Sequence, residues 1–169
     1  MSADATELLR TRARALARPL DDDADAGHLV EVVTFELGGG RYALDLGLLQ
    51  RIVRLEHLAP VPHAPPFVVG VVPLRGMPLP VLDIGRFLAA ATGSSPEDRG
   101  WLLVLGQGPD ALGVPSSSMP VTATVDPAEL VATDTDPGDW VRGVTDDGTV
   151  WLDGQRILDD PRLVVQGGR

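Results

Sequence analysis

The chain has 169 residues, enough for one well-buried domain or for two small barrels that share a core, and too few for several independent domains. Hydrophobic residues make up 44% of it and aromatic residues only 4%, so Val, Leu, Ile and Ala must build the core. The formal net charge of -10 repels phosphate backbones, which argues against nucleic acid as a partner, and the absence of cysteine excludes disulfides and thiolate metal sites.

No apolar run reaches the ~20 residues that a membrane span requires. The amino terminus also lacks the apolar region of a signal peptide. We therefore expect a cytoplasmic protein without direct membrane insertion.

The first segment, residues 1–28, is predicted to be a short helix followed by an acidic linker. Apolar residues recur at helical spacing over residues 5–18, and arginines line another side of the same helix. This helix either docks on an acidic or membrane surface or, as we favour, packs against its own domain with a solvated basic face. Pro19 ends the helix, and the sequence DDDADAG then forms the linker.

The folded domain is predicted over residues 29–165, where short β-rich runs alternate with Gly, Pro and Asp clusters. Three glycines at 38–40 supply the positive φ angles of a tight hairpin; a phosphate-binding loop is the weaker alternative, because no Lys-Ser/Thr pair follows. Four prolines between residues 60 and 66 prevent a regular helix or strand in this stretch, which we call the crossing segment. Further strands are predicted at 67–74, 79–84, 101–105, 111–114, 121–125, 140–144 and 149–152, with short helices at 85–93 and 154–160.

Many short strands with little helix between them favour small barrels over a parallel sheet. The predicted class is therefore mostly β.

The sequence contains few candidate residues for catalysis. His57 and His63 flank prolines in the crossing segment without a carboxylate between them, which makes a poor metal motif. Residues 116–118, three consecutive serines, lack the strand-turn-helix setting of an activated hydroxyl and are interpreted as a turn. No metal or cofactor site is predicted. Two carboxylates, Asp45 and Asp83, stand inside apolar runs and need partners, for which Arg75 is available.

Four segments, in chain order, resemble the CheW-like domain family of chemotaxis coupling proteins. They are FELGGGRYALDLGLLQRIV, APVPHAPPFVVGVVPLRGMPLPVLDI, ALGV and WVRGVTDDGTVWLDGQRIL. The second is the most specific, because its prolines, Gly70, the Leu-Arg-Gly triplet, Pro80 and Asp83 all fall at family spacing. The resemblance covers about residues 30 to 160.

The resemblance implies two small five-stranded SH3-like barrels packed on a shared core, and a non-enzymatic adaptor. Proteins of this family bind the tip of a chemoreceptor's cytoplasmic helical hairpin and the regulatory domain of the chemotaxis histidine kinase. By matching positions, the residues expected on or near these partner-binding surfaces are Leu49, Arg51, Gly70, Arg75 and Leu102.

Arg75 has two interpretations. Gly76 permits a tight turn, so Arg75 can project from a barrel rim and bind a carboxylate on a partner helix. Alternatively, it pairs internally with Asp83 or Asp45 and fixes the loop. Gly76, Pro80 and Asp83 are expected to have structural roles.

Three positions depart from the family pattern. Arg51 stands where the family often has an acidic residue, Pro73 replaces an asparagine before the Leu-Arg-Gly triplet, and Ser117 replaces a common aspartate. A reversed charge on a contact surface changes partner specificity. The alternative function is therefore a module that binds the receptor without recruiting the kinase; a small hydrolase is the remote alternative.

Overall fold

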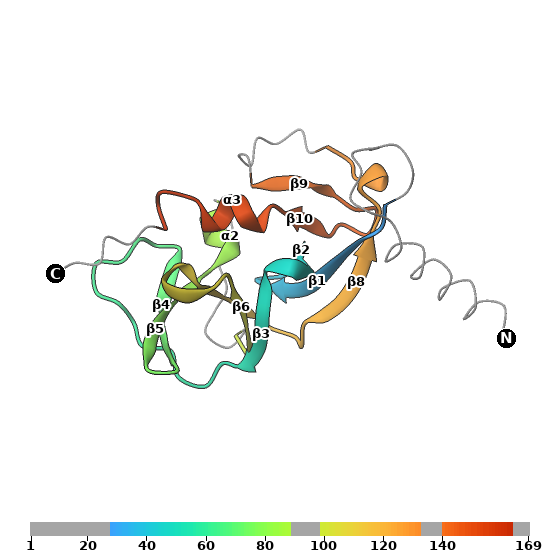
Figure 1. Cartoon of the computed structure of the whole chain (residues 1–169). Coiled ribbons are helices and arrows are strands. Elements are labelled where there is room, and N and C mark those ends of the chain that lie inside the picture. The colour runs from blue at the N-terminus through green and yellow to red at the C-terminus, as the bar shows by residue number, and fades with distance from the viewer. Residues whose placement is uncertain (1–27, 89–98, 133–139, 164–169) are drawn as a thin grey trace, which may run out of the picture.

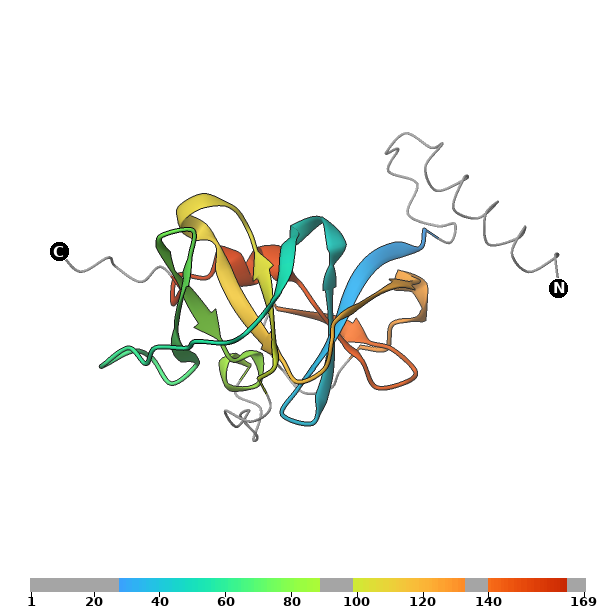
Figure 2. The same ribbon diagram turned by 90° about the horizontal axis from the view of Figure 1, so that it is seen from below.

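The computed structural model describes residues 28–88, 99–132 and 140–163, which form two five-stranded sheets (Figure 1). The first sheet has the strand order β8-β1-β2-β10-β9 and comprises β1 (Val30–Leu37), β2 (Gly40–Asp45), β8 (Val121–Val125), β9 (Val141–Val144) and β10 (Val150–Leu152). The second has the order β3-β6-β7-β5-β4 and comprises β3 (Leu49–Arg54), β4 (Val68–Leu74), β5 (Met77–Leu82), β6 (Trp101–Leu105) and β7 (Leu112–Ser116). The two sheets lie side by side (Figure 2).

Short helices connect and flank these strands. The α-helices are α2 (Ile84–Phe87) and α3 (Gly154–Leu158), and the 3-10 helices are η1 (Leu46–Leu48), η3 (Gly108–Asp110) and η4 (Pro127–Glu129). The mostly β class and every predicted strand are confirmed, with boundaries that differ by at most two residues. The predicted helix over 5–18 lies outside the described residues, as does the second half of the helix predicted over 85–93.

The two sheets have the same topology. Strands β3, β4, β5, β6 and β7 correspond in order to β8, β9, β10, β1 and β2, and in each sheet one pair, β5 with β7 or β10 with β2, is parallel. In each unit a short helix capped by an aspartate also follows the equivalent strand, α2 after β5 and α3 after β10. The Asp83 carboxylate accepts from the Arg86 N–H, and the Asp153 carboxylate accepts from the Arg156 N–H, both at 3.1 Å. The fold is therefore a duplicated five-stranded unit. In the first sheet, β1 and β2 come before the other three strands in the chain, whereas their equivalents in the second sheet, β6 and β7, come after the other three.

Three apolar clusters explain how the units pack. One cluster lies within the first sheet and contains Val32, Ala43 and Trp151, while another lies within the second and contains Leu79, Val81, Leu102 and Val104. The largest cluster contains residues of both sheets, including Val33 and Phe35 of β1 and Leu103 and Leu105 of β6. Alternate residues of β1 and β6 thus face an internal cluster and the shared one, as strand periodicity requires. The predicted shared core is confirmed.

Each sheet is closed in the same way. The chain that follows β3 pairs with β4 through Ala59 and Val71, and the chain that follows β8 pairs with β9 through Val131 and Val144. Both pairs exchange two backbone hydrogen bonds of 2.8–3.0 Å. The proline-rich crossing predicted from the sequence is therefore the segment that closes the second barrel.

A buried glycine lies beneath each closing segment. A Cβ on Gly70 would lie 2.6 Å from the Ala59 carbonyl oxygen, and one on Gly143 would lie 2.9 Å from the Leu130 Cβ. We expect Gly70→Ala to lower the free energy of unfolding by about 1–2 kcal/mol, because the contact is with backbone that must shift. Gly47→Ala is the matched control, since a Cβ there meets nothing within 4 Å. Equal urea midpoints for the two variants would contradict this account of Gly70.

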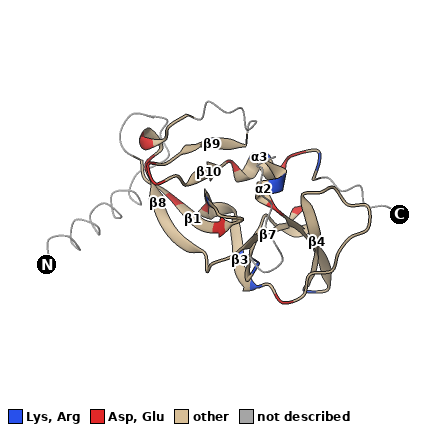
Figure 3. Cartoon of the chain, turned by 180° about the vertical axis from the view of Figure 1, so that it is seen from behind, with Lys and Arg blue, Asp and Glu red and all other residues tan. Residues whose placement is uncertain are grey.

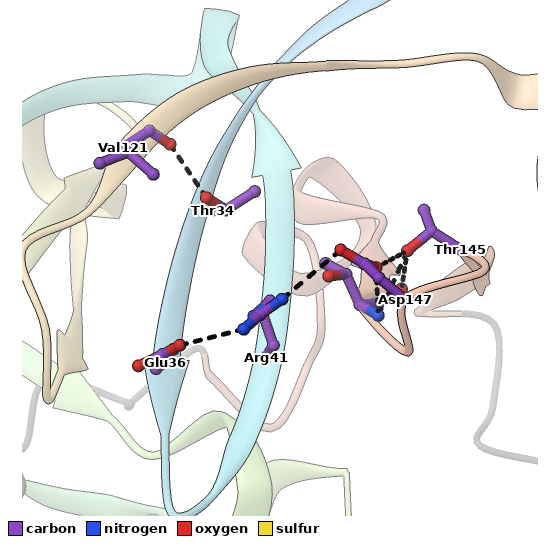
Figure 4. A network of polar contacts seen from close by, with 7 residues as sticks. Thr34, Glu36, Arg41, Val121, Thr145 and Asp147 are labelled. Atoms are coloured by element: carbon purple, nitrogen blue, oxygen red, sulfur yellow. Dashed lines mark hydrogen bonds and ion pairs between the residues drawn. The ribbon is translucent and has the colours of Figure 1, made fainter.

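The β9–β10 turn is tied to β2 by a polar network (Figure 4). Arg41 of β2 lies 3.5 Å from both the Glu36 and the Asp147 carboxylates. Hydrogen bonds from Thr145 and Thr149 lower the pKa of Asp147 to about 2. The Arg41 guanidinium acts in the same direction.

This depressed pKa predicts a contribution to acid stability. Asp147 stabilises the fold fully above its ordinary pKa of 3.8, and the contribution is lost as the pH falls through about 2. The Asp147 side chain is 62% exposed, so we expect Asp147→Asn to remove at most about 1 kcal/mol at neutral pH. Chemical denaturation at pH 6 and at pH 2 should show the difference between the two proteins shrinking with acid. A difference that is constant over this range would contradict the assignment.

Candidate functional site

A shallow groove of about 530 Å³ lies where the two units meet. Its walls are the η1–β3 connection, the turn between β6 and β7, and α3. The lining residues are mainly leucine, amide and aspartate side chains: Leu48, Leu49, Gln50, Gln107, Asp110, Gln155, Leu158 and Asp159, together with Gly47 and Gly106. Apolar side chains with amides between them can hold the surface of an amphipathic helix.

Strand β3 forms one wall of the groove and is an edge of the second sheet. The predicted residue Leu49 lines the groove and packs partly against the shared core. Gln50 occupies a β-bulge between Leu49 and Arg51, and its side-chain amide donates to the Gly106 carbonyl at 3.1 Å. The bulge is the kind of irregularity that turns side chains at an edge, and here it separates Leu49 from Arg51.

Arg51 is half-buried on β3, and Arg54 is exposed at the end of the same strand. Figure 3 marks basic positions on β3 and beside α2 and α3. The Arg54 guanidinium lies over the Trp101 ring, 4.6 Å from its centroid. Within the three described ranges, no carboxylate forms an ion pair with Arg51 or Arg54. Arg51 was named from the sequence and Arg54 was missed, because a spacing of three places two side chains of a strand on opposite faces and so gave no signal for a shared site.

Arg75 lies at the tip of the β4–β5 hairpin, the bottom of the molecule in Figure 1. Arg75 and Gly76 are both exposed and both have positive φ, 50° and 78°. Two successive residues of this kind make the hairpin turn that most often contains Asn-Gly. Arginine therefore occupies a position that its backbone disfavours, and its side chain points away from the core.

The predicted internal ion pair of Arg75 with Asp83 or Asp45 is wrong. Asp83 is fully buried and lies 3.8 Å from the Arg86 Nε and 3.9 Å from the Arg99 Nη2. Asp45 instead accepts from the Trp151 indole at 2.9 Å and pairs with Arg142 at 3.2 Å. Both carboxylates have local partners, which leaves the rim interpretation of Arg75.

Pro73, Pro78 and Pro80 all belong to the β4–β5 hairpin. Pro73 lies opposite Pro78, and Val71 lies opposite Pro80. The parallel pairing of β5 with its other neighbour, β7, has one register position among the described residues, Val81 opposite Gly113. The prolines therefore occupy the part of the hairpin that extends beyond β7, where a missing N–H costs little.

Two predicted surface residues are buried. Leu102 has no exposed surface and packs in the internal cluster of the second barrel, so the expectation of a surface position for its side chain is wrong. Strand β6 lies between β3 and β7, and this central place in the sheet explains the burial. Gly70 is also buried, and its close approach to Ala59 gives it a role in closing the barrel.

The remaining candidates for chemistry do not converge. His57 and His63 are exposed in the crossing segment, and no cluster of metal-ligating side chains occurs within the described residues. Ser116 is buried at the end of β7 rather than in a turn, and its hydroxyl donates to the Ser118 carbonyl at 2.7 Å. Ser117 bonds the Glu36 carbonyl at 3.1 Å. These hydroxyls hold the β7–β8 connection against β1.

A further cluster joins the two units and was missed from the sequence. The Arg162 guanidinium lies 4.2 Å from the Phe87 ring centroid and 4.5 Å from that of Trp140, and it pairs with Asp160. Phe87 belongs to α2, next to the second sheet, and Trp140 directly precedes β9 of the first. The Arg162 guanidinium, which lies over two aromatic rings that contact each other, therefore packs the end of the described chain across the junction.

None of the helices in the described part of the chain has the length and apolar character that crossing a bilayer requires.

Two linked five-stranded units with an open groove where they meet define the class of protein as a small, mostly β module. Residues 31–162 match the model of the CheW-like domain, so the chain belongs to the CheW-like domain family.

Relatives agree with this assignment. The chain is 29% identical over 87 residues to the chemotaxis protein CheW of Treponema pallidum, an alignment that covers 50% of this chain and 51% of the relative. It is 34% identical over 65 residues to the chemotaxis protein CheW of Thermotoga maritima, covering 38% of this chain and 43% of the relative. The chain thus spans about half the length of these relatives or less.

A solved structure shows the same fold. The scaffolding protein TtCheW of Thermoanaerobacter tengcongensis superimposes with a TM-score of 0.60 at 20% identity, covering 74% of this chain and 89% of TtCheW. At this identity the likeness concerns the fold alone.

Proposed function

We propose that this protein is a non-catalytic adaptor that couples chemoreceptors to a chemotaxis histidine kinase in the cytoplasm. The observation that carries the proposal is the match of residues 31–162 to the CheW-like domain. The name that two of its relatives carry, chemotaxis protein CheW, supports the same function.

The proposed receptor site is the groove with its β3 wall. The tip of a receptor hairpin presents amphipathic helix surface, which matches a groove lined by Leu48, Leu49 and Leu158 with amides between them. Arg51 follows Gln50 of the groove wall and has no carboxylate partner among the described residues, so it is available to an acidic residue of a helix.

The proposed second contact is the β4–β5 hairpin with Arg75 at its tip. This tip lies at the opposite side of the molecule in Figure 1 from α3, which forms another wall of the groove. Two separate surfaces on one closely packed body allow both partners to bind at once. Coupling would then be positional, since a movement of one partner is passed on through a rigid module.

Calorimetric titration against each partner separately tests the proposal. We expect both the kinase regulatory domain and a soluble receptor hairpin to bind more tightly than ~100 μM, a free energy of about -5.5 kcal/mol. Absence of binding to both at that concentration would overturn the proposal.

Arg51 supports a second candidate function, a module that binds the receptor without recruiting the kinase. Its cation stands where the family often has an acidic residue, and like charges across an interface repel. In that case Arg51→Glu should create kinase binding that the native chain lacks. If the native chain binds both partners, the second candidate is rejected.

A further inference from the structure

Strand β8 is an edge of the first sheet and is exposed along most of its length. Residues 121–124 are exposed, and Val121 retains 58% of its accessible surface. Figure 1 shows β8 as the last strand of its sheet, next to β1. The strand is fixed in place by five residue pairs with β1 without a register shift, and by the Thr34 hydroxyl, which donates to the Val121 carbonyl at 3.1 Å (Figure 4).

The other three sheet edges carry features that prevent pairing with another strand. Strand β3 has a bulge and two arginines, while β4 has a bulge, Pro73 and the covering segment at Ala59. Strand β9 carries Arg142 and is covered at Val144 by Val131. Charges, bulges, prolines and covering segments are the usual protection of an edge. Strand β8 has no charge, proline or bulge, and within the described residues no segment pairs with its outer side.

The sequence of β8, Val-Thr-Ala-Thr-Val, reads the same in both directions. When two copies of such a strand pair antiparallel about a two-fold axis at Ala123, each residue meets its own kind. Val121 lies opposite Val125, Thr122 lies opposite Thr124, and Ala123 lies opposite itself. Pairs of β-branched residues and of threonines stabilise antiparallel neighbours, and a two-fold interface requires this self-complementarity.

Charge favours the same arrangement. The chain carries a net charge of -10, so most of its surface opposes contact with a second copy. The uncharged β8 reduces this repulsion where the backbones approach. In the proposed register Asp126 faces Pro120 of the other copy rather than an acidic residue.

We propose that β8 is a self-association site, through which two copies of this protein join their first sheets by antiparallel pairing centred on Ala123. The pairing concerns the protein alone and is independent of the proposed coupling function. A five-residue edge buries little area, so the dimer forms at high local concentration.

Sedimentation of the full chain tests the association. We expect the weight-average mass to rise from 17.9 kDa towards twice that value as the concentration is raised from ~10 μM to ~1 mM. Thr122→Asp/Thr124→Asp places carboxylates directly opposite each other and should leave a monomer with an unchanged circular dichroism spectrum. A native chain that remains monomeric at every concentration would overturn the proposal.

Cysteine cross-linking tests the register and does not depend on the behaviour of the aspartate variant. The native chain has no cysteine, so each engineered thiol is alone. Ala123→Cys brings two Cα atoms to ~5 Å across the axis, within disulfide reach, and should oxidise rapidly to a covalent dimer.

Thr122→Cys and Thr124→Cys are the matched controls on the same strand. In each of them the identical thiols are offset by two residues and their Cα atoms are ~8 Å apart, beyond disulfide reach. Each variant by itself should form a disulfide-linked dimer slowly. An equal mixture of the two variants should form the mixed dimer, in which Cys from one variant lies opposite Cys from the other. Equal oxidation rates for all three single variants would contradict the register.

Discussion

Asp83→Ala is expected to lower the free energy of unfolding by about 3–5 kcal/mol. The Asp83 side chain is fully buried, caps α2 and pairs with Arg86 and Arg99. The Arg99 side chain is only 7% exposed, so loss of the carboxylate leaves a buried guanidinium without this counter-charge. Urea denaturation of the native chain and the variant measures the loss.

Asp153→Ala is the matched control, because the duplicated fold places Asp153 at the equivalent cap of α3. Asp153 retains 18% of its side-chain surface, and its partners Arg142 and Arg156 are 37% and 59% exposed. Its loss should therefore cost about 1 kcal/mol, the usual cost of a missing N-cap. Equal losses in the two variants would mean that burial of the Asp83 ion pairs does not govern stability.

Arg75→Asn is expected to separate partner binding from folding. Asparagine adopts positive φ more readily than arginine, and Asn-Gly is the preferred pair for this hairpin turn. The variant should therefore be as stable as the native chain or more stable by up to about 1 kcal/mol. It removes the cation, so under the proposed function affinity for the partner that contacts the hairpin should fall ten- to a hundredfold, or about 1.4–2.7 kcal/mol.

Arg75→Lys is the informative companion, because it keeps the charge and loses the planar fork. Partial recovery of affinity would indicate a bidentate contact, and full recovery would indicate charge alone. Titrations with both partners at two salt concentrations check these outcomes. Native affinity of Arg75→Asn for both partners would contradict a role for the hairpin tip in binding.

The strands were predictable because short runs rich in β-branched residues alternate along this chain with clusters of Gly, Pro and Asp. The hairpin at residues 38–40 followed from its glycines, and Gly38 and Gly39 indeed have φ of 57° and 79°. The barrel-closing role of the crossing segment was not predictable, because it depends on the close approach of Ala59 to Gly70, two residues far apart in sequence.

The duplication left a signal that was overlooked. The segments at 82–88 and 152–158 share the pattern Leu-Asp-x-x-Arg-x-Leu, which places an N-cap aspartate and its arginine at the same positions of α2 and α3. That pattern predicts pairing of Asp83 with Arg86 instead of Arg75.

The candidate site was predictable only in part. Leu49, Arg51 and Arg75 lie where a partner can reach them, whereas Leu102 is in the core. The sequence of β6 could not show whether the Leu102 side chain is exposed. Both faces of this central strand are buried and every residue in it is apolar, so there is no alternation of polar and apolar residues to distinguish the faces. The groove combines three segments distant in sequence and needed the fold to be recognised.

The central claim is that one rigid module holds two partners at once through separate surfaces. The direct measurement is titration of the kinase regulatory domain into the protein already saturated with the receptor hairpin. The account predicts a three-component complex, with an affinity for the kinase domain close to that measured without the hairpin. Displacement of the hairpin by the kinase domain, or binding of only one of the two, would contradict it.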